Sequence, residues 1–275
     1  MITVASTDGV RLAVHELGTS DPDAPPLLLC HATGFHGRVW RAVAEELPEW
    51  RCLALDFRGY GDSTEQDGAL HWQGFADDVL AVVDALELGP VAAVGHSKGG
   101  AAILLAEQAR PGTIERAVCF EPIVFPPVEG ERGPNHLAEI TKKRREVFGS
   151  FEEAIENFAS KPPLGSLRPD VLEDYVRHGF AEQPDGTIRL KARREHEAMT
   201  YEMGPHHDGF VHLGEVKCPV LVAHGGDGDG PAQIAPLVAD ALPDAELRAF
   251  PELGHFGPLE DPAGFAAVVR EFLSR

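Results

Sequence analysis

The stretch that most constrains this chain is the hexapeptide Gly-His-Ser-Lys-Gly-Gly at residues 95–100. The apolar run Val-Ala-Ala-Val at residues 91–94 precedes it, and a helix-forming run at residues 101–110 follows it. A strand, a tight turn and a helix must therefore share about twenty residues. In this setting, a Gly-x-Ser-x-Gly turn raises the hydroxyl of Ser97 above the end of a sheet, because the glycines remove side chains that would collide. The pattern predicts a nucleophilic serine.

Strand-like and helix-like segments alternate on both sides of this turn. Strand patterns lie at residues 27–30, 51–56, 91–94, 116–120, 219–224 and 245–250, and helical patterns at 38–47, 71–88, 101–110, 232–242 and 262–274. Residues 1–18 alternate apolar and polar side chains around Asp8 and Gly9, which predicts a hairpin. The fold class that follows is α/β, with a mostly parallel central sheet and helices on both faces.

The alternation of strand and helix patterns stops between residues 123 and 210. No strand pattern occurs there; polar helical stretches at 136–148, 151–159 and 170–180 are separated by proline-containing breaks. We therefore predict a helical cap over residues 123–210, inserted into one core domain formed by residues 1–122 and 211–275.

Charge and cysteine content narrow the function classes. The chain has 24 Lys and Arg against 44 Asp and Glu, a formal net charge of −20, which would repel nucleic acids and anionic lipid surfaces. The first residues show no signal-peptide pattern, and no run of eighteen apolar residues occurs, so we expect a cytoplasmic protein with a small-molecule substrate. The four cysteines lack Cys-x-x-Cys spacing, which predicts buried reduced thiols rather than disulfides or a zinc site.

A serine hydroxyl is a poor nucleophile at neutral pH and needs a base, which a carboxylate in turn orients. Among the thirteen histidines, His255 is the strongest candidate for the base. It follows the last strand pattern in a glycine-containing loop, at the edge of the sheet where Ser97 is expected.

The combined motifs resemble the α/β-hydrolase superfamily, in the branch with an inserted helical cap. The resemblance covers nearly the whole core. The segments that carry it are His-Ala-Thr-Gly-Phe at 31–35 (with Ala32 where the family usually has glycine), Asp-Phe-Arg-Gly-Tyr-Gly-Asp-Ser at 56–63, the hexapeptide at 95–100, Leu-Gly-His-Phe at 253–256 and Glu-Asp-Pro at 260–262. The family's chain order of nucleophile, acid and histidine is also kept.

The resemblance implies roles for further residues. The backbone N–H groups of Thr33 and Lys98 would form the oxyanion hole. In most of the family the acid follows the strand at 219–224, where Asp227 and Asp229 lie; other branches place it after the preceding strand, where Glu121 lies. We favour Glu121 and keep Asp229, then Asp227, as alternatives.

The reaction class follows from the nucleophile. Dehalogenases and epoxide hydrolases of this fold carry aspartate where this chain has Ser97, so serine indicates acyl transfer: a serine hydrolase without cofactor or metal, acting on a small or medium carboxylic ester or lactone. One alternative is a perhydrolase-type haloperoxidase or another cofactor-independent oxidative enzyme of this fold. A second is a small-ligand binding protein with a vestigial triad.

Four other polar features of the sequence are expected to have structural rather than catalytic roles. The ammonium group of Lys98 could meet an anionic substrate, but we expect it to reach solvent or a cap carboxylate. The string His206-His207-Asp208 is expected to be a polar loop rather than a metal site, and Lys-Lys-Arg-Arg at 142–145 a solvated helix face. The loop at 56–63 is expected to be braced by hydrogen bonds of its arginine.

Overall fold

The computed structural model describes residues 1–19, 21–66, 68–127, 135–204, 206–226 and 230–275. Its centre is an eight-stranded sheet in the order β1-β2-β4-β3-β5-β6-β10-β11. β1 and β2 form the predicted antiparallel hairpin, β2 is antiparallel to β4, and the strands from β4 to β11 are parallel. Their bounds are β1 (Ile2–Ala5), β2 (Arg11–Gly18), β3 (Pro26–Cys30), β4 (Arg51–Asp56), β5 (Val91–His96), β6 (Ile114–Phe120), β10 (Val220–Gly225) and β11 (Ala245–Phe250).

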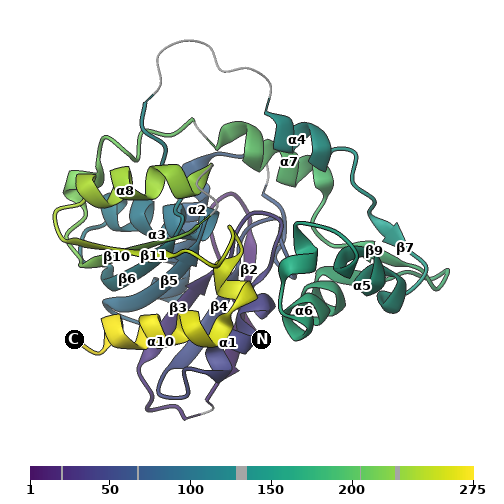
Figure 1. Cartoon of the computed structure of the whole chain (residues 1–275), viewed down its shortest axis with the longest axis horizontal. Helices are drawn as coiled ribbons and strands as arrows, with labels where there is room; N and C mark the ends of the chain where they lie inside the picture. Colours follow the sequence, from purple (N-terminus) through teal and green to yellow (C-terminus); the bar gives the residue numbers. More distant parts are fainter. Residues whose placement is uncertain (20, 67, 128–134, 205, 227–229) are drawn as a thin grey trace.

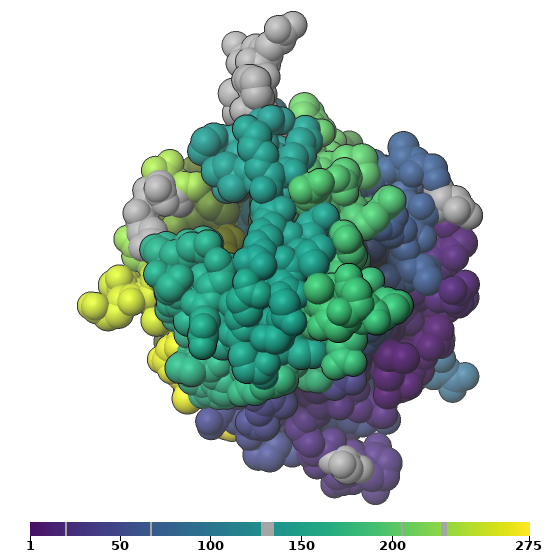
Figure 2. Space-filling model, turned by 90° about the vertical axis from the view of Figure 1, so that its right-hand side faces the viewer, coloured from purple at the N-terminus to yellow at the C-terminus, as the bar shows by residue number. Residues whose placement is uncertain are grey.

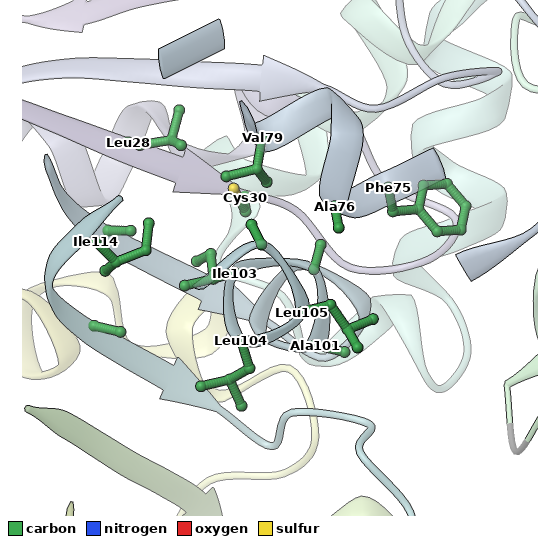
Figure 3. Packing of buried hydrophobic residues seen from close by; sticks show 14 of the residues in the cluster. Leu28, Cys30, Phe75, Ala76, Val79, Ala101, Ile103, Leu104, Leu105 and Ile114 are labelled. Carbon is green, nitrogen blue, oxygen red and sulfur yellow. The ribbon is translucent and has the colours of Figure 1, made fainter. Parts of the chain in front are cut away.

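Helices cover both faces of the sheet (Figure 1). One face carries α2 (Trp72–Ala85), α3 (Lys98–Ala109) and α8 (Pro231–Ala241); the other carries α1 (Arg41–Glu45) and α10 (Pro262–Leu273), with η1 (Gly37–Trp40) and α9 (Gly257–Glu260) at their ends. Figure 3 shows Ile103 and Leu104 of α3 packed among side chains of the strands and of α2. Residues 27–30 of strand β3 are fully buried because both faces are covered, which is why this part of the strand is a continuous apolar run.

Most of the helices between β6 and β10 lie at one side of the sheet (Figure 1). They are α4 (His136–Thr141), α5 (Phe151–Ala159), α6 (Pro169–Gly179) and α7 (Arg194–Met203), with the short turns η2 (Leu164–Ser166) and η3 (Leu213–Glu215).

Two expectations for this segment were wrong. It contains a second sheet, β7 (Val147–Phe148), β9 (Ile188–Leu190) and β8 (Phe180–Glu182), whose strands of two or three residues are too short to produce a sequence period. The helix expected at 136–148 ends at Thr141.

All four cysteines are free and buried. Within the described residues, no helix has the length and apolar character needed to cross a lipid bilayer.

The carboxyl ends of the parallel strands bring the predicted site residues to one edge of the sheet. Ser97 follows β5, Glu121 follows β6 and His255 lies in the loop after β11. In open α/β sheets this is the edge at which ligands bind.

Candidate active site

Ser97 sits in a tight turn between β5 and α3 that only small neighbours allow. Its backbone has φ +53° and ψ −112°, a sparsely populated conformation of the kind that concentrates at functional sites. A Cβ on Gly99 would lie 2.1 Å from the carbonyl oxygen of Cys30, and one on Gly95 would lie 2.5 Å from the nitrogen of Gly100. The two glycines are therefore required by close backbone approach, and the turn holds Ser97 at 5% exposure.

His255 lies against the carboxylate of Glu121. The Nδ1 atom of His255 is hydrogen-bonded to Oε2 of Glu121, and Oε1 of Glu121 accepts the N–H of Gly225 at 2.8 Å. Glu121 is 1% exposed and has φ +46°, and its own N–H is donated to the carbonyl of Ala223 at 2.8 Å. A carboxylate on Nδ1 keeps the proton there, which leaves Nε2 of the neutral imidazole as the basic atom. The other two candidate acids, Asp227 and Asp229, lie outside the described residues.

The backbone around His255 is fixed from two sides. The buried ring of His96 donates its Nε2 hydrogen to the carbonyl oxygen of His255 at 2.8 Å. Burial, and to a lesser extent the nearby imidazole of His255, lowers the pKa of His96 well below its usual value, in agreement with a neutral ring. On the other side, Oε2 of Glu260 accepts the N–H of Gly254 at 2.8 Å. Glu260 was part of a recognised motif, but nothing in the sequence indicated that it would hold this loop.

Two backbone N–H groups are available beside Ser97. Lys98 is the first residue of α3, so its N–H precedes the first intrahelical hydrogen bond. Among the hydrogen bonds between described residues, none uses the N–H of Thr33. The loop of Thr33 is held by His31, whose Nδ1 donates to the carbonyl of Ala32 at 2.7 Å and whose Nε2 accepts the N–H of Phe57 at 3.1 Å. Burial lowers the pKa of His31 well below its usual value, in agreement with this neutral tautomer.

Ser97, Thr33 and His255 line one cavity of about 800 Å³. Ile123, Leu137 and further residues of the segment between β6 and β10 form much of its wall. Figure 2 shows this segment in teal and green over one face of the molecule, with a hollow in which atoms of the yellow C-terminal part are visible.

The side chain of Lys98 points away from this cavity, which corrects both expectations for it. Lys98 is 0% exposed and its Nζ has no hydrogen-bond partner. The nitrogen lies over three rings, at 3.6 Å from the centroid of Tyr60, 4.5 Å from that of Phe57 and 4.8 Å from that of Phe75. Burial lowers the pKa of Lys98 well below its usual value, although the charges of nearby carboxylates act in the opposite direction.

Replacing Lys98 by methionine should raise the stability of the fold in a pH-dependent way. Because the folded-state pKa is lowered, the unfolded chain binds a proton that the folded chain binds less readily, so the wild type loses stability as pH falls below about 10.4. We expect Lys98→Met to raise the free energy of unfolding near pH 6, because methionine removes the cost of burying an amine that the unfolded chain protonates more readily. Urea unfolding at several pH values measures it.

In that measurement the gain should shrink as pH rises towards 10. Lys143→Met, at an exposed lysine, is the control and should show no such trend. Destabilisation by Lys98→Met at every pH would mean that the contacts between ammonium and rings outweigh the cost of burying the charge.

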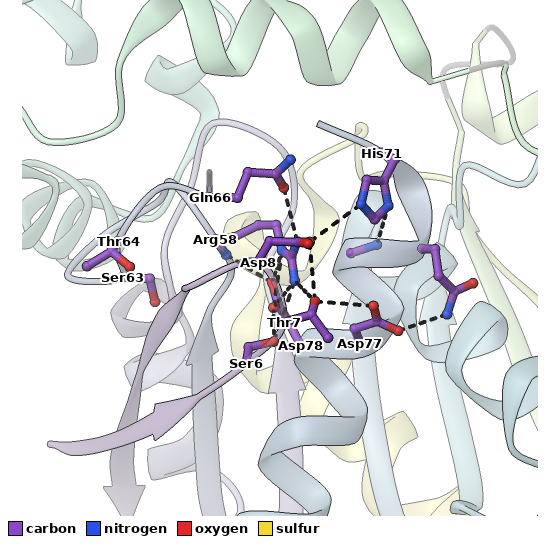
Figure 4. Close-up of polar contacts among 12 residues, drawn as sticks. Ser6, Thr7, Asp8, Arg58, Ser63, Thr64, Gln66, His71, Asp77 and Asp78 are labelled. Atoms are coloured by element: carbon purple, nitrogen blue, oxygen red, sulfur yellow. Dashed lines mark hydrogen bonds and ion pairs between the residues drawn. The ribbon is translucent and has the colours of Figure 1, made fainter. Parts of the chain in front are cut away.

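The segment at 56–63 is braced as the sequence predicts (Figure 4). The guanidinium of Arg58 is fully buried, pairs with Asp78 at 2.8 Å and with Asp8 at 2.9 Å, and donates to the hydroxyl of Thr7 at 2.9 Å. This network ties the loop to α2 and to the N-terminal hairpin.

One group of side chains in the described residues, His15, Asp56 and Asp62, has the spacing of metal ligands. The oxygens of Asp56 are already engaged: Oδ1 accepts the N–H of Gly37 at 2.6 Å, and Oδ2 accepts the N–H of Asp62 at 2.8 Å and contacts Nε2 of His15 at 2.9 Å. Asp62 pairs with Lys191 at 2.6 Å. The group therefore serves to hold the loop.

The predictions for two polar clusters, residues 206–208 and 142–145, fared differently. His207 lies in a loop, with Nε2 bonded to the carbonyl of Ile123 at 3.1 Å and its ring 4.7 Å from that of Trp72, in agreement with a structural role. The prediction for residues 142–145 was partly wrong. They follow the end of α4, and Arg144 is half-buried and paired with Glu197 at 2.7 Å instead of facing solvent.

Comparisons with known proteins agree with this architecture. Lipase LipV of Mycobacterium tuberculosis is 35% identical over 96% of this chain and 98% of its own length. A non-heme chloroperoxidase of Streptomyces lividans is 27% identical over 93% of each chain. The crystal structure of E-2-(acetamidomethylene)succinate hydrolase superposes with a TM-score of 0.80 at 20% identity, covering 100% of this chain and 99% of the other, which supports the fold.

The family model of the alpha/beta hydrolases matches residues 27–268. This range includes the tight turn at Ser97, strands β6 and β10, which end at Phe120 and Gly225, and the loop of His255. The sheet order, the turn geometry and the family match lead to one assignment: the chain belongs to the alpha/beta hydrolase family.

Proposed function

We propose that this protein is a serine hydrolase that cleaves a small or medium carboxylic ester or lactone through an acyl-serine intermediate. The observation that carries the proposal is the meeting of three groups at one edge of the sheet. Ser97 stands on a strained turn and lines the same cavity as His255, whose Nδ1 is bonded to the buried carboxylate of Glu121. The 35% identity to a protein named as a lipase supports ester chemistry.

In the proposed first half-reaction, the Oγ atom of Ser97 attacks the ester carbonyl carbon while Nε2 of His255 takes the hydroxyl proton. The N–H groups of Thr33 and Lys98 stabilise the oxyanion, each by about 3 kcal/mol. Glu121 keeps the other imidazole proton on Nδ1 and stabilises the cation that forms. The intermediate collapses with cleavage of the carbon–oxygen bond, and His255 returns the proton to the departing alkoxide.

In the second half-reaction, His255 takes a proton from water, and the hydroxide attacks the acyl-serine carbonyl. Collapse of this second tetrahedral intermediate releases the carboxylic acid and restores Ser97 with its proton. We further propose that residues 123–210 act as a cap that shapes the acyl site, which the contributions of Ile123 and Leu137 to the cavity wall support.

A fluorophosphonate probe tests the nucleophile directly. The probe should label Ser97 alone, found by mass spectrometry of the peptide that contains it, and the protein should hydrolyse short 4-nitrophenyl esters. A protein that is neither labelled nor active on any ester would contradict the proposal. Tight small-ligand binding in a thermal-shift assay without turnover would then support the binding-protein alternative.

The chloroperoxidase relative gives the second candidate, perhydrolysis. In that reaction hydrogen peroxide replaces water in attack on the acyl-serine, and the released peracid oxidises halide. Bromination of monochlorodimedone that depends on peroxide and a carboxylic acid, at a rate above that of ester hydrolysis, would favour this candidate. A bromination rate far below hydrolysis would favour the esterase.

A further inference from the structure

The cavity above Ser97 has hydrocarbon walls and an apolar rim. Ile123, Phe125 and Phe256 form walls that are only half-buried, whereas Ser97 lies at the closed end with 5% exposure. Three further residues of the lining are exposed: Leu137, Pro162 and Pro163. Leu137 is exposed to 55%. A substrate that places its carbonyl at Ser97 therefore extends its remaining part along apolar surface as far as the opening.

The described lining residues include no lysine or arginine. Their one carboxylate belongs to Glu260, and both of its oxygens are used, since Oε2 accepts the N–H of Gly254 and Oε1 accepts the hydroxyl of Ser166, each at 2.8 Å. Tyr201 is kept neutral because burial raises the pKa of its phenol. Apart from His255, the described wall therefore offers hydrogen bonds but no positive charge.

The basic side chains of Lys98 and Arg144 lie near this region but do not line the cavity. The ammonium of Lys98 is enclosed by the rings of Tyr60, Phe57 and Phe75 and has no path to a substrate. Arg144 pairs with Glu197 at 2.7 Å, and Glu197 is 3% exposed. A carboxylate on a bound acyl group would thus lose its hydration without gaining a cationic partner, a net cost in free energy. The net charge of −20 adds repulsion at long range.

We propose that the cavity selects uncharged esters with an apolar acyl chain and discriminates against esters whose acyl chain carries a carboxylate. This inference rests on the proposed function, which it makes specific. The selection arises from the apolar walls and from the placement of Lys98 and Arg144, whose basic groups are enclosed by rings and paired with Glu197, respectively.

Three 4-nitrophenyl esters of matched length test the selection: pentanoate, the glutarate monoester with a free carboxylate, and its methyl ester, which is neutral. For the wild type, kcat/KM should be at least tenfold lower for the carboxylate than for its methyl ester, a difference of about 1.4 kcal/mol. The pentanoate should be hydrolysed at least as well as the methyl ester. Equal or faster hydrolysis of the carboxylate ester would overturn the inference while leaving the serine hydrolase proposal intact.

A charge placed on the rim gives the complementary test. Leu137→Lys should raise the ratio of kcat/KM for the carboxylate ester to kcat/KM for its methyl ester at least fivefold above the same ratio in Leu137→Gln, the matched polar control. Because Leu137 is exposed, both variants should fold. No difference between the variants would count against the assigned path of the acyl chain.

Binding to Ser97→Ala keeps the inference testable even without turnover. By calorimetry the neutral methyl ester should bind at least fivefold more tightly than the carboxylate. Tighter binding of the carboxylate would overturn the selection. Absence of hydrolysis and of probe labelling in the wild type would instead overturn the proposed function.

Discussion

Replacing Ser97 by alanine should lower kcat/KM for ester hydrolysis by about 10⁴-fold or more. The variant keeps the N–H groups of Thr33 and Lys98, so oxyanion stabilisation remains and only the covalent route is lost. Alanine also keeps the steric volume close to that of serine at a position where φ is +53°. Steady-state hydrolysis of a 4-nitrophenyl ester, with the background rate subtracted, measures the effect.

A matched control separates chemistry from folding. Ser160→Ala removes a hydroxyl that bonds the carbonyl of Asn157 on an exposed part of the chain, and it should leave kcat/KM unchanged. Thermal unfolding of Ser97→Ala should remain cooperative, with a midpoint close to that of the wild type. Retention of more than a tenth of the activity by the folded Ser97→Ala protein would exclude Ser97 as the nucleophile.

Exchange of Glu121 for glutamine should lower kcat by about 10³- to 10⁴-fold, the range seen when the carboxylate of such a triad becomes an amide. The N–H of Gly225 needs an acceptor, so the amide oxygen of the glutamine faces Gly225 and its nitrogen faces His255. That nitrogen cannot accept the Nδ1 proton, and the imidazole is driven to the tautomer with its proton on Nε2. That tautomer cannot take the proton of Ser97. Single-turnover kinetics should place the loss in acylation, with KM changed much less than kcat.

The two other candidate acids, which follow β10 in the sequence, provide the comparison. Asp229→Asn and Asp227→Asn should each change kcat less than threefold if Glu121 holds the histidine. A large loss in Asp229→Asn together with a small loss in Glu121→Gln would reverse the assignment. The amide at 121 could also disturb its bond from the N–H of Gly225, so thermal unfolding of Glu121→Gln must be measured alongside.

Local signals predicted the core of the fold well. The strand before Ser97 and the helix after it were visible because the apolar run and the glycines are dictated by burial and by close backbone approach. His255 was placed correctly at the edge of the sheet from its position after the last strand, and Glu121 from its position at the end of β6. Their catalytic roles remain predictions.

Long-range contacts were beyond the reach of the sequence. The cage around Lys98 joins Phe57, Tyr60 and Phe75 from two separate segments, and no local period marks such a meeting. Charge alone suggested that Lys98 and Arg144 would face water, but tertiary packing buried the first and paired the second. The short strands of the second sheet were missed because they are stabilised by one another rather than by their own patterns.

The place where the chain leaves and re-enters the main sheet has an evolutionary consequence. β6 ends at Phe120, which pairs with Ala223 of β10, so the segment between the two strands starts and finishes at neighbouring positions. A single contiguous stretch of gene could therefore be exchanged for another without separating these strands. Ser97 and His255 lie on opposite sides of that stretch in the sequence. Recombination there would give descendants a different wall for the cavity and would leave Ser97 and His255 in place.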